Sequence, residues 1–141
     1  MKNMIISIFL CLILGLTMSF YLFKQYDVPA SIEVEKLTFL QLAVYSDMES
    51  LNKNININQY IYSEEKDGIH VYVAITKNNA ELLKNFFEQK GYSVYLKEIL
   101  VSNESFIKDV ENADILLQQV TDEKSILAII REILEKYEVI T

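Results

Sequence analysis

The chain has 141 residues, of which 51 % are hydrophobic, and its 13 basic and 20 acidic side chains give a net charge of −7. This length supports one domain with a modest core, and the acidic balance argues against a nucleic-acid partner, because phosphates are bound by basic patches. Only three glycines are present, which excludes a glycine-rich nucleotide loop.

The first feature along the chain is an uncharged run of twenty residues, 4 to 23, MIISIFLCLILGLTMSFYLF. A helix that spans a bilayer needs about 20 such residues, and Tyr21 and Phe23 beside Lys24 suit the membrane interface. A cleaved signal peptide is the alternative, but the short apolar region and small-residue cleavage site that it predicts are missing. We therefore expect a single transmembrane helix at 4 to 23 in the cell membrane. The charges of the amino terminus and Lys2 slightly favour an extracytoplasmic domain.

Residues 24 to 37, KQYDVPASIEVEKL, hold the only proline and show no clear period, which is typical of a short tether. The following run, TFLQLAVYS at 38 to 46, alternates as a strand does. Leu40, Leu42 and Val44 form a predicted core face. The opposite face, which includes Gln41, is too apolar to be fully exposed to water and too polar to be simply buried. This second face raises the question of what it contacts.

Two further strands follow a short helix predicted around DMESLNKNI. The runs QYIYS at 59 to 63 and IHVYVAIT at 69 to 76 alternate in the same way. Asp67 and Gly68 lie between these runs, and this pair is a strong signal for a tight turn. We therefore expect an antiparallel hairpin.

The clearest helix pattern is NNAELLKNFFEQKG, residues 78 to 91. Asn78 is a candidate N-cap with Glu81 three residues on, and Gly91 can end the helix in the left-handed conformation. The run YSVYLKEILV at 92 to 101 then predicts a fourth strand.

Two amphipathic helices are predicted beyond residue 101, and Thr121 or Asp122 is expected to cap the second. Their apolar positions recur at alternating spacings of four and three: Phe106, Val110, Ala113, Leu117 and Val120, then Ile126, Ile130, Ile133, Tyr137 and Ile140. The predicted class is α+β, a four-stranded antiparallel sheet in the order β-α-β-β-α-β, with two C-terminal helices and one N-terminal transmembrane helix. The α+β domain should cover 38 to 101 and the helical pair 102 to 141.

Three segments resemble the SPOR domain, the sporulation-related repeat that binds peptidoglycan. QLAVYS at 41 to 46 is similar to the first strand of that family, and HVYVAIT at 70 to 76 is similar to its third. NAELLKNFFEQKGYSVYL at 79 to 96 resembles its second helix and last strand. The resemblance implies the same sheet and a protein that binds the wall in bacterial cell division or sporulation.

The chain departs from the family pattern at several positions. Ala43 and Ala74 stand where the family usually has glycine, and His70 and Tyr72 lie where it usually has arginine. Gln41 alone matches cleanly. The fold is therefore better supported than glycan binding.

No catalytic constellation emerges from the sequence, so we expect no enzyme, no metal site and no cofactor. His70 is the only histidine, and Cys11 falls within the predicted membrane span. The candidate glycan- or partner-binding residues lie on the second face of the strands: Phe39, Gln41, Tyr45, Tyr62, His70, Tyr72 and Tyr95. Tyrosine-rich faces suit sugar rings and protein interfaces alike, and the two C-terminal helices are a third possible cover.

Two functions therefore stay open. The chain is expected to be either a membrane-anchored SPOR-like protein that binds peptidoglycan, or a membrane-anchored adaptor whose degenerate SPOR-like domain and helical tail bind another protein. Retained basic and glycine positions would favour the first function, and their loss favours the second.

Overall fold

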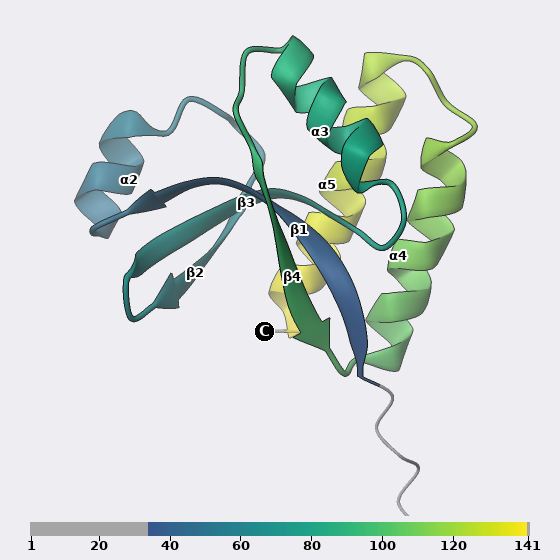
Figure 1. The fold of residues 1–141 in the computed structure, drawn as a ribbon, viewed down its shortest axis with the longest axis horizontal. Coiled ribbons are helices and arrows are strands. Elements are labelled where there is room, and N and C mark those ends of the chain that lie inside the picture. Colours follow the sequence, from purple (N-terminus) through teal and green to yellow (C-terminus); the bar gives the residue numbers. More distant parts are fainter. Residues whose placement is uncertain (1–33, 141) are drawn as a thin grey trace, which may run out of the picture. The chain divides into compact units, whose positions relative to one another are not determined.

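A computed structural model describes residues 34–140 and shows an α+β fold in which four helices pack on a four-stranded antiparallel sheet (Figure 1). The predicted class and the β-α-β-β-α-β order are confirmed for this part of the chain. The transmembrane helix expected at 4 to 23 lies outside the described residues. Among the helices of 34–140, none has the length and apolar character needed to cross a bilayer.

The sheet has the strand order β2-β3-β1-β4, so the first and third strands along the chain form its centre. Its strands are β1 (Glu35–Tyr45), β2 (Ile61–Glu65), β3 (Gly68–Thr76) and β4 (Tyr95–Val101). β1 therefore begins three residues before the expected position, inside the stretch interpreted as a tether. The β2–β3 turn needs Gly68, whose φ is +140° and where an added Cβ would lie 2.6 Å from the carbonyl oxygen of Tyr45.

The helices are α2 (Met48–Asn54), α3 (Ala80–Gln89), α4 (Glu104–Leu117) and α5 (Glu123–Ile140). Side-chain caps satisfy the first-turn N–H groups of α2 and α4, because Asp47 accepts from Ser50 at 2.7 Å and Asn103 accepts from Phe106 at 2.9 Å. Asp122 precedes α5 in the same way, and its carboxylate accepts the N–H of Ser125 at 2.8 Å.

The predicted N-cap of α3 is wrong by one residue, because Asn79 and not Asn78 occupies the cap position. The Asn79 side chain makes no capping bond to the helix and instead donates to the Asp114 carbonyl of α4 at 2.8 Å. The predicted end of α3 is confirmed. Gly91 has a φ of +86°, and its N–H donates to the Glu88 carbonyl at 2.9 Å.

Two irregularities interrupt the pairing of β1 with β3. Leu40 lies opposite Ala74. The next residue of β1, Gln41, lies opposite Tyr72, so Val73 is passed over. This is the two-against-one pairing of a β-bulge.

The second irregularity follows at once on the other strand. Ala43 lies opposite Val71, so Leu42 is passed over in turn. Paired residues share a face of a sheet, so each extra residue reverses the alternation of the strand that carries it. Tyr45 consequently lies opposite Ile69, on the face away from Tyr72.

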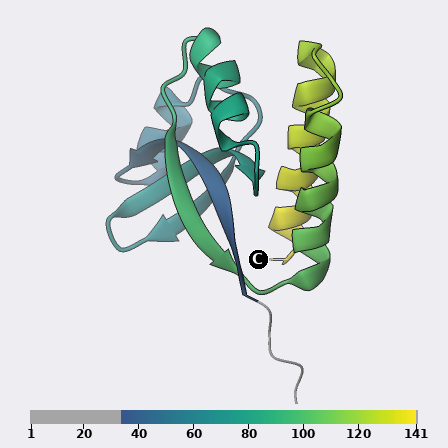
Figure 2. The same cartoon turned by 45° about the vertical axis from the view of Figure 1, so that its right-hand side comes forward.

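The helices divide between the two faces of the sheet. Leu51 of α2 packs with Ile69 and Val71 on one face. On the other face, Tyr137 of α5 contacts Phe39, with ring centroids 5.2 Å apart. Figure 2 shows α4 and α5 side by side as an antiparallel pair. The pattern of buried residues that was predicted for this pair is confirmed at Phe106, Val110, Ala113, Leu117, Ile126, Ile130 and Ile133.

Candidate functional site

The structure brings together five of the seven candidate residues on one sheet face. Gln41 of β1 lies opposite Tyr72 of β3 and opposite Tyr95 of β4, and its side chain is hydrogen-bonded to His70. Phe39 lies beside Tyr72, with ring centroids 5.3 Å apart. The alternation of apolar and polar residues therefore predicted this grouping correctly.

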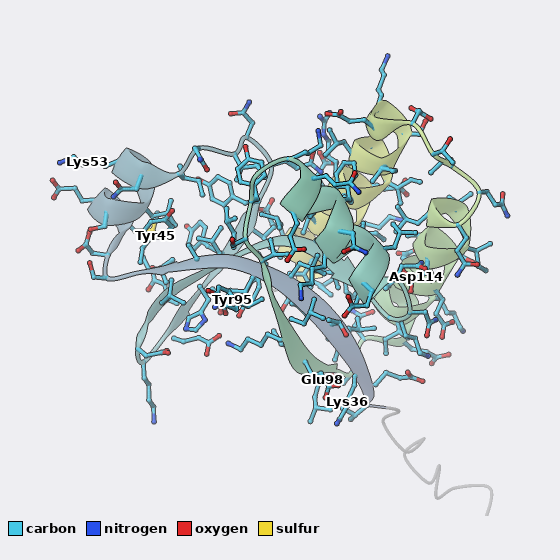
Figure 3. All side chains as sticks on the ribbon, turned by 45° about the horizontal axis from the view of Figure 1, so that its top comes forward. Lys36, Tyr45, Lys53, Tyr95, Glu98 and Asp114 are labelled. Carbon is cyan, nitrogen blue, oxygen red and sulfur yellow. The ribbon has the colours of Figure 1, made fainter. Side chains whose placement is uncertain are left out.

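The placement of Tyr45 and Tyr62 on that same face is wrong. Tyr45 follows both bulges and packs with the α2 cluster around Leu51, and Figure 3 shows it beside α2. Tyr62 lies opposite Val71, so it also shares the α2 face. In β2 it is Ile61 that lies opposite Tyr72.

The apolar end of the predicted face is covered by the chain itself. Phe39 has 0 % of its surface exposed, and Tyr137 of α5 lies against both Phe39 and Phe106 of α4. Tyr72 is buried as well, whereas Tyr95 keeps 68 % of its surface exposed. The C-terminal helices thus cover the Phe39 end of the face and leave Tyr95 exposed.

A polar group occupies the other end of the face, and residues of all four strands and the β2–β3 turn contribute to it. We call it the sheet cluster, and its members are Gln41, Glu65, Asp67, His70, Tyr72 and Lys97. At its centre, His70 has only 7 % of its side chain exposed. Its Nδ1 lies 2.8 Å from Gln41 Oε1, and its Nε2 lies 2.9 Å from Asp67 Oδ1 and 3.9 Å from Glu65 Oε2.

Lys97 joins the outer strands of the sheet across this cluster. Its ammonium donates to Glu65 Oε1 at 2.6 Å and to the Tyr72 hydroxyl at 3.1 Å. The Tyr72 hydroxyl in turn donates to Glu65 Oε1 at 3.1 Å. Within residues 34–140, every buried side-chain nitrogen or oxygen has a hydrogen-bond partner, so the cluster is a satisfied network.

The network shifts the acid–base equilibria of its members. The hydrogen bond from Lys97 holds the pKa of Glu65 below its ordinary value, and the hydrogen bond with His70 lowers the pKa of Asp67. Burial raises the pKa of the Tyr72 phenol. Burial opposes the charge on Lys97, but its bonds to Glu65 and Tyr72 outweigh this effect, so its pKa is raised. Both carboxylates and the ammonium are therefore charged at neutral pH.

Sequence reasoning missed Glu65, Asp67 and Lys97 as members of the site. The tight-turn signal at Asp67 and Gly68 could have identified Glu65 and Asp67. Such a turn brings Glu65 opposite the start of β3 and near His70. Lys97 shares its sheet face with Tyr95 and lies opposite Phe39, but its partners depend on which strands are neighbours. The strand order could not be read from the alternating pattern.

A second candidate site is a groove of about 720 Å³, which we call the α5 groove. It lies between the α2–β2 loop, the end of α3 and α5, and its volume falls within the range of ligand sites. Its apolar lining residues are Ile57, Ile61, Val73, Phe87, Leu127, Ile130 and Leu134, and its polar and aromatic ones are Asn56, Asn58, Gln59, Tyr60, Lys90, Tyr92, Arg131, Glu135 and Glu138. Ile61, Val73, Phe87, Ile130 and Leu134 belong to the core, whereas the rim carries charges of both signs.

The loop side of the groove is fixed to its two walls. Gln59 donates to the Leu127 carbonyl of α5 at 3.1 Å, and the Tyr92 hydroxyl donates to the Asn56 carbonyl at 3.3 Å. Loop backbone held in this way can present its remaining amides to a bound chain at little cost in ordering entropy.

Comparison with known proteins finds no family model that matches this chain, and neither a curated protein nor a solved structure matches it.

Proposed function

We propose that the chain is a membrane-anchored adaptor without enzymatic activity, which binds another protein through the α5 groove. Residues 4 to 23 serve as its anchor, and the domain lies outside the cytoplasm. The observation that carries the proposal is the position of α5. This helix covers Phe39 on the sheet face and at the same time forms one wall of an open groove.

The lining of the groove suits a polypeptide. Protein segments bind in grooves through apolar anchors, while a polar rim satisfies the remaining groups. Ile130 and Leu134 supply apolar surface along α5, and Arg131 and Glu135 flank it with opposite charges. A partner helix or extended segment with mixed charge would meet complementary groups on both sides.

Binding of peptidoglycan at the sheet face, as the SPOR resemblance implies, is the second candidate. It is favoured by Tyr95, whose ring is largely exposed beside Gln41 and is free for a sugar to stack on. It is disfavoured by the cover over Phe39 and by the burial of Tyr72. A single exposed ring offers a glycan less contact area than a row of rings.

Site-specific photocrosslinking of the full chain in its native cells tests the adaptor proposal. A photoreactive residue at Leu127, on the groove wall, should give one discrete adduct with another protein. The matched position Lys53, exposed on α2 and outside the groove lining, should give none (Figure 3). Arg131→Glu should reduce the Leu127 adduct at least about fivefold, since it reverses one rim charge.

A sedimentation assay with purified peptidoglycan separates the second candidate from the first. The adaptor proposal expects no co-sedimentation of the chain. Co-sedimentation that Tyr95→Ala abolishes and Arg131→Glu leaves unchanged would replace the adaptor by a wall-binding protein.

A further inference from the structure

We propose that Glu65, Asp67 and His70 form a binding site for a divalent cation, with zinc as the best-matched ion and Gln41 as the residue that orients the histidine. None of these residues lines the α5 groove, so the site is independent of the adaptor proposal.

The spacing of the three donor atoms fits a small metal ion. His70 Nε2, one oxygen of Asp67 and one oxygen of Glu65 all lie within 4.8 Å of one another. Zinc holds nitrogen and oxygen ligands at about 2.0–2.2 Å in a tetrahedron, which places ligand atoms about 3.4 Å apart. The distances from Nε2, 2.9 Å to Asp67 and 3.9 Å to Glu65, lie on either side of that value.

The orientation of the histidine ring also points to a cation. Gln41 Oε1 lies 2.8 Å from Nδ1, the nitrogen at which a metal-bound histidine has its second partner. Nε2 is thereby directed toward Asp67 and Glu65, whose oxygens lie 2.9 and 3.9 Å away. A divalent ion placed between these three groups would be held by one nitrogen and two carboxylate oxygens.

The ring is held in this position by its surroundings. It is almost fully buried and stacks at 6.4 Å on Tyr72. Asp67, by contrast, lies in the β2–β3 turn with 71 % of its side chain exposed. A fixed histidine with an exposed carboxylate beside it gives the ion a path from solvent and leaves a coordination position for water.

Lys97 weakens the site without closing it. Its ammonium binds Oε1 of Glu65, so the other oxygen of that carboxylate remains directed at His70. The ammonium also lies 3.4 Å from Nδ1 of His70, which is longer than the contact of that nitrogen with Gln41. Two carboxylates and one ammonium leave a single negative charge to balance the ion. Removing the ammonium should therefore tighten binding.

Titration of the untagged full chain with zinc, by calorimetry in detergent, tests the proposal. One ion per chain should bind, and magnesium at the same concentration should not compete, because it prefers oxygen ligands and retains its waters. Cobalt in place of zinc should give the visible absorption of a four-coordinate site. Since His70 is the only histidine, a histidine ligand seen in this spectrum can come only from this site.

Four variants test this arrangement. Asp67→Asn, at an exposed turn position, should weaken zinc binding at least about tenfold, and Gln41→Ala, which removes the partner of His70 Nδ1, should also weaken it about tenfold or more. Lys97→Met should tighten it at least about threefold by relieving repulsion. Glu64→Gln is the matched control, because Glu64 neighbours Glu65 but lies opposite Ile69 on the other face; its affinity should equal that of the wild type.

Absence of zinc binding in both the wild type and Lys97→Met, or binding that Asp67→Asn leaves unchanged, would overturn the proposal. The sheet cluster would then be an ion-pair network alone. Because Asp67 is exposed, the Asp67→Asn result does not depend on whether variants of the buried histidine fold.

Discussion

Asp114 is a buried carboxylate that reaches from α4 to the segment between β3 and α3. It accepts the Thr76 hydroxyl on one oxygen and the N–H groups of Lys77 and Asn78 on the other, at 2.9 and 2.7 Å. Hydrogen bonds to a charged group are stronger than neutral ones, and here two of them satisfy partly buried backbone donors. One side chain therefore ties the helical pair to the end of the central strand.

Asp114→Asn should lower the free energy of unfolding by about 2–4 kcal/mol, because the amide that replaces one oxygen presents N–H donors to existing donors. Urea unfolding followed by circular dichroism measures the effect. Asp109→Asn is the matched control on the same helix, since Asp109 forms only a surface pair with Lys136 at 3.1 Å and should lose under about 1 kcal/mol. Equal losses in the two variants would contradict this role of Asp114.

The importance of Asp114 could not be read from the sequence. The apolar stripe of α4 was predicted from its spacing, and Ala113 and Leu117 are indeed buried. An acidic residue beside that stripe looks like part of a solvated outer face. Its partners lie 36 to 38 residues away along the chain, and only the packing of α4 against the end of β3 brings them together.

At the scale of the elements, the existence and type of each predicted segment followed from local patterns, whereas several strand bounds and the faces of two tyrosines did not. Alternation correctly joined Phe39, Gln41 and Tyr72, because these residues precede or flank the first bulge. It failed at Tyr45, which follows both bulges. A bulge depends on how β1 pairs with a strand that lies about 30 residues further on, and local alternation contains no information about that pairing.

The start of α5 makes a prediction about acid stability. Hydrogen bonds from Ser125 hold the pKa of Asp122 below its ordinary value of 3.8. A lowered pKa in the folded state gives stability that is present above about pH 3.8 and is lost as the pH falls through the folded value. Asp122→Asn keeps an acceptor at the cap but does not titrate. Its stability should therefore fall less steeply than that of the wild type below about pH 4.

Urea unfolding at a series of pH values measures this slope. Asp122→Ala, which removes the cap at every pH, should already be less stable than the wild type at pH 7. If the wild type and Asp122→Asn lose stability in parallel as the pH falls, the carboxylate has no such role.

For the whole molecule, the sheet and the helical pair should unfold together. The described residues belong to one compact unit, and the core continues from Leu37 and Phe39 on β1 to Ile130 and Leu134 on α5. This continuity makes the two C-terminal helices part of the fold of the sheet. They are not an appended module.

A fragment that ends at Ser102 should therefore fail to fold as a monomer. Uncovering even about 200 Å² of apolar surface costs about 5 kcal/mol, which equals the whole stability of many small domains. Size-exclusion chromatography and urea unfolding should show aggregation or early melting of this fragment, and one cooperative transition for the matched fragment 34 to 141.

Two substitutions locate the effect in the longer fragment. Tyr137→Ala should lose about 2–4 kcal/mol, because its ring packs between Phe39 and Phe106. Tyr137→Phe keeps these ring contacts and should lose clearly less. A stable, monomeric short fragment would show that α4 and α5 fold independently of the sheet.

The position of Tyr137 near the end of the chain also sets a time order during synthesis. Phe39 is made 98 residues before the ring that covers it. At about 5–20 residues per second, the interval between them is about 5–20 s. For that time the nascent sheet exposes an apolar surface that a chaperone or a protease can bind. Chains that stop before α5 keep this surface permanently exposed, so they stay available to chaperones and proteases.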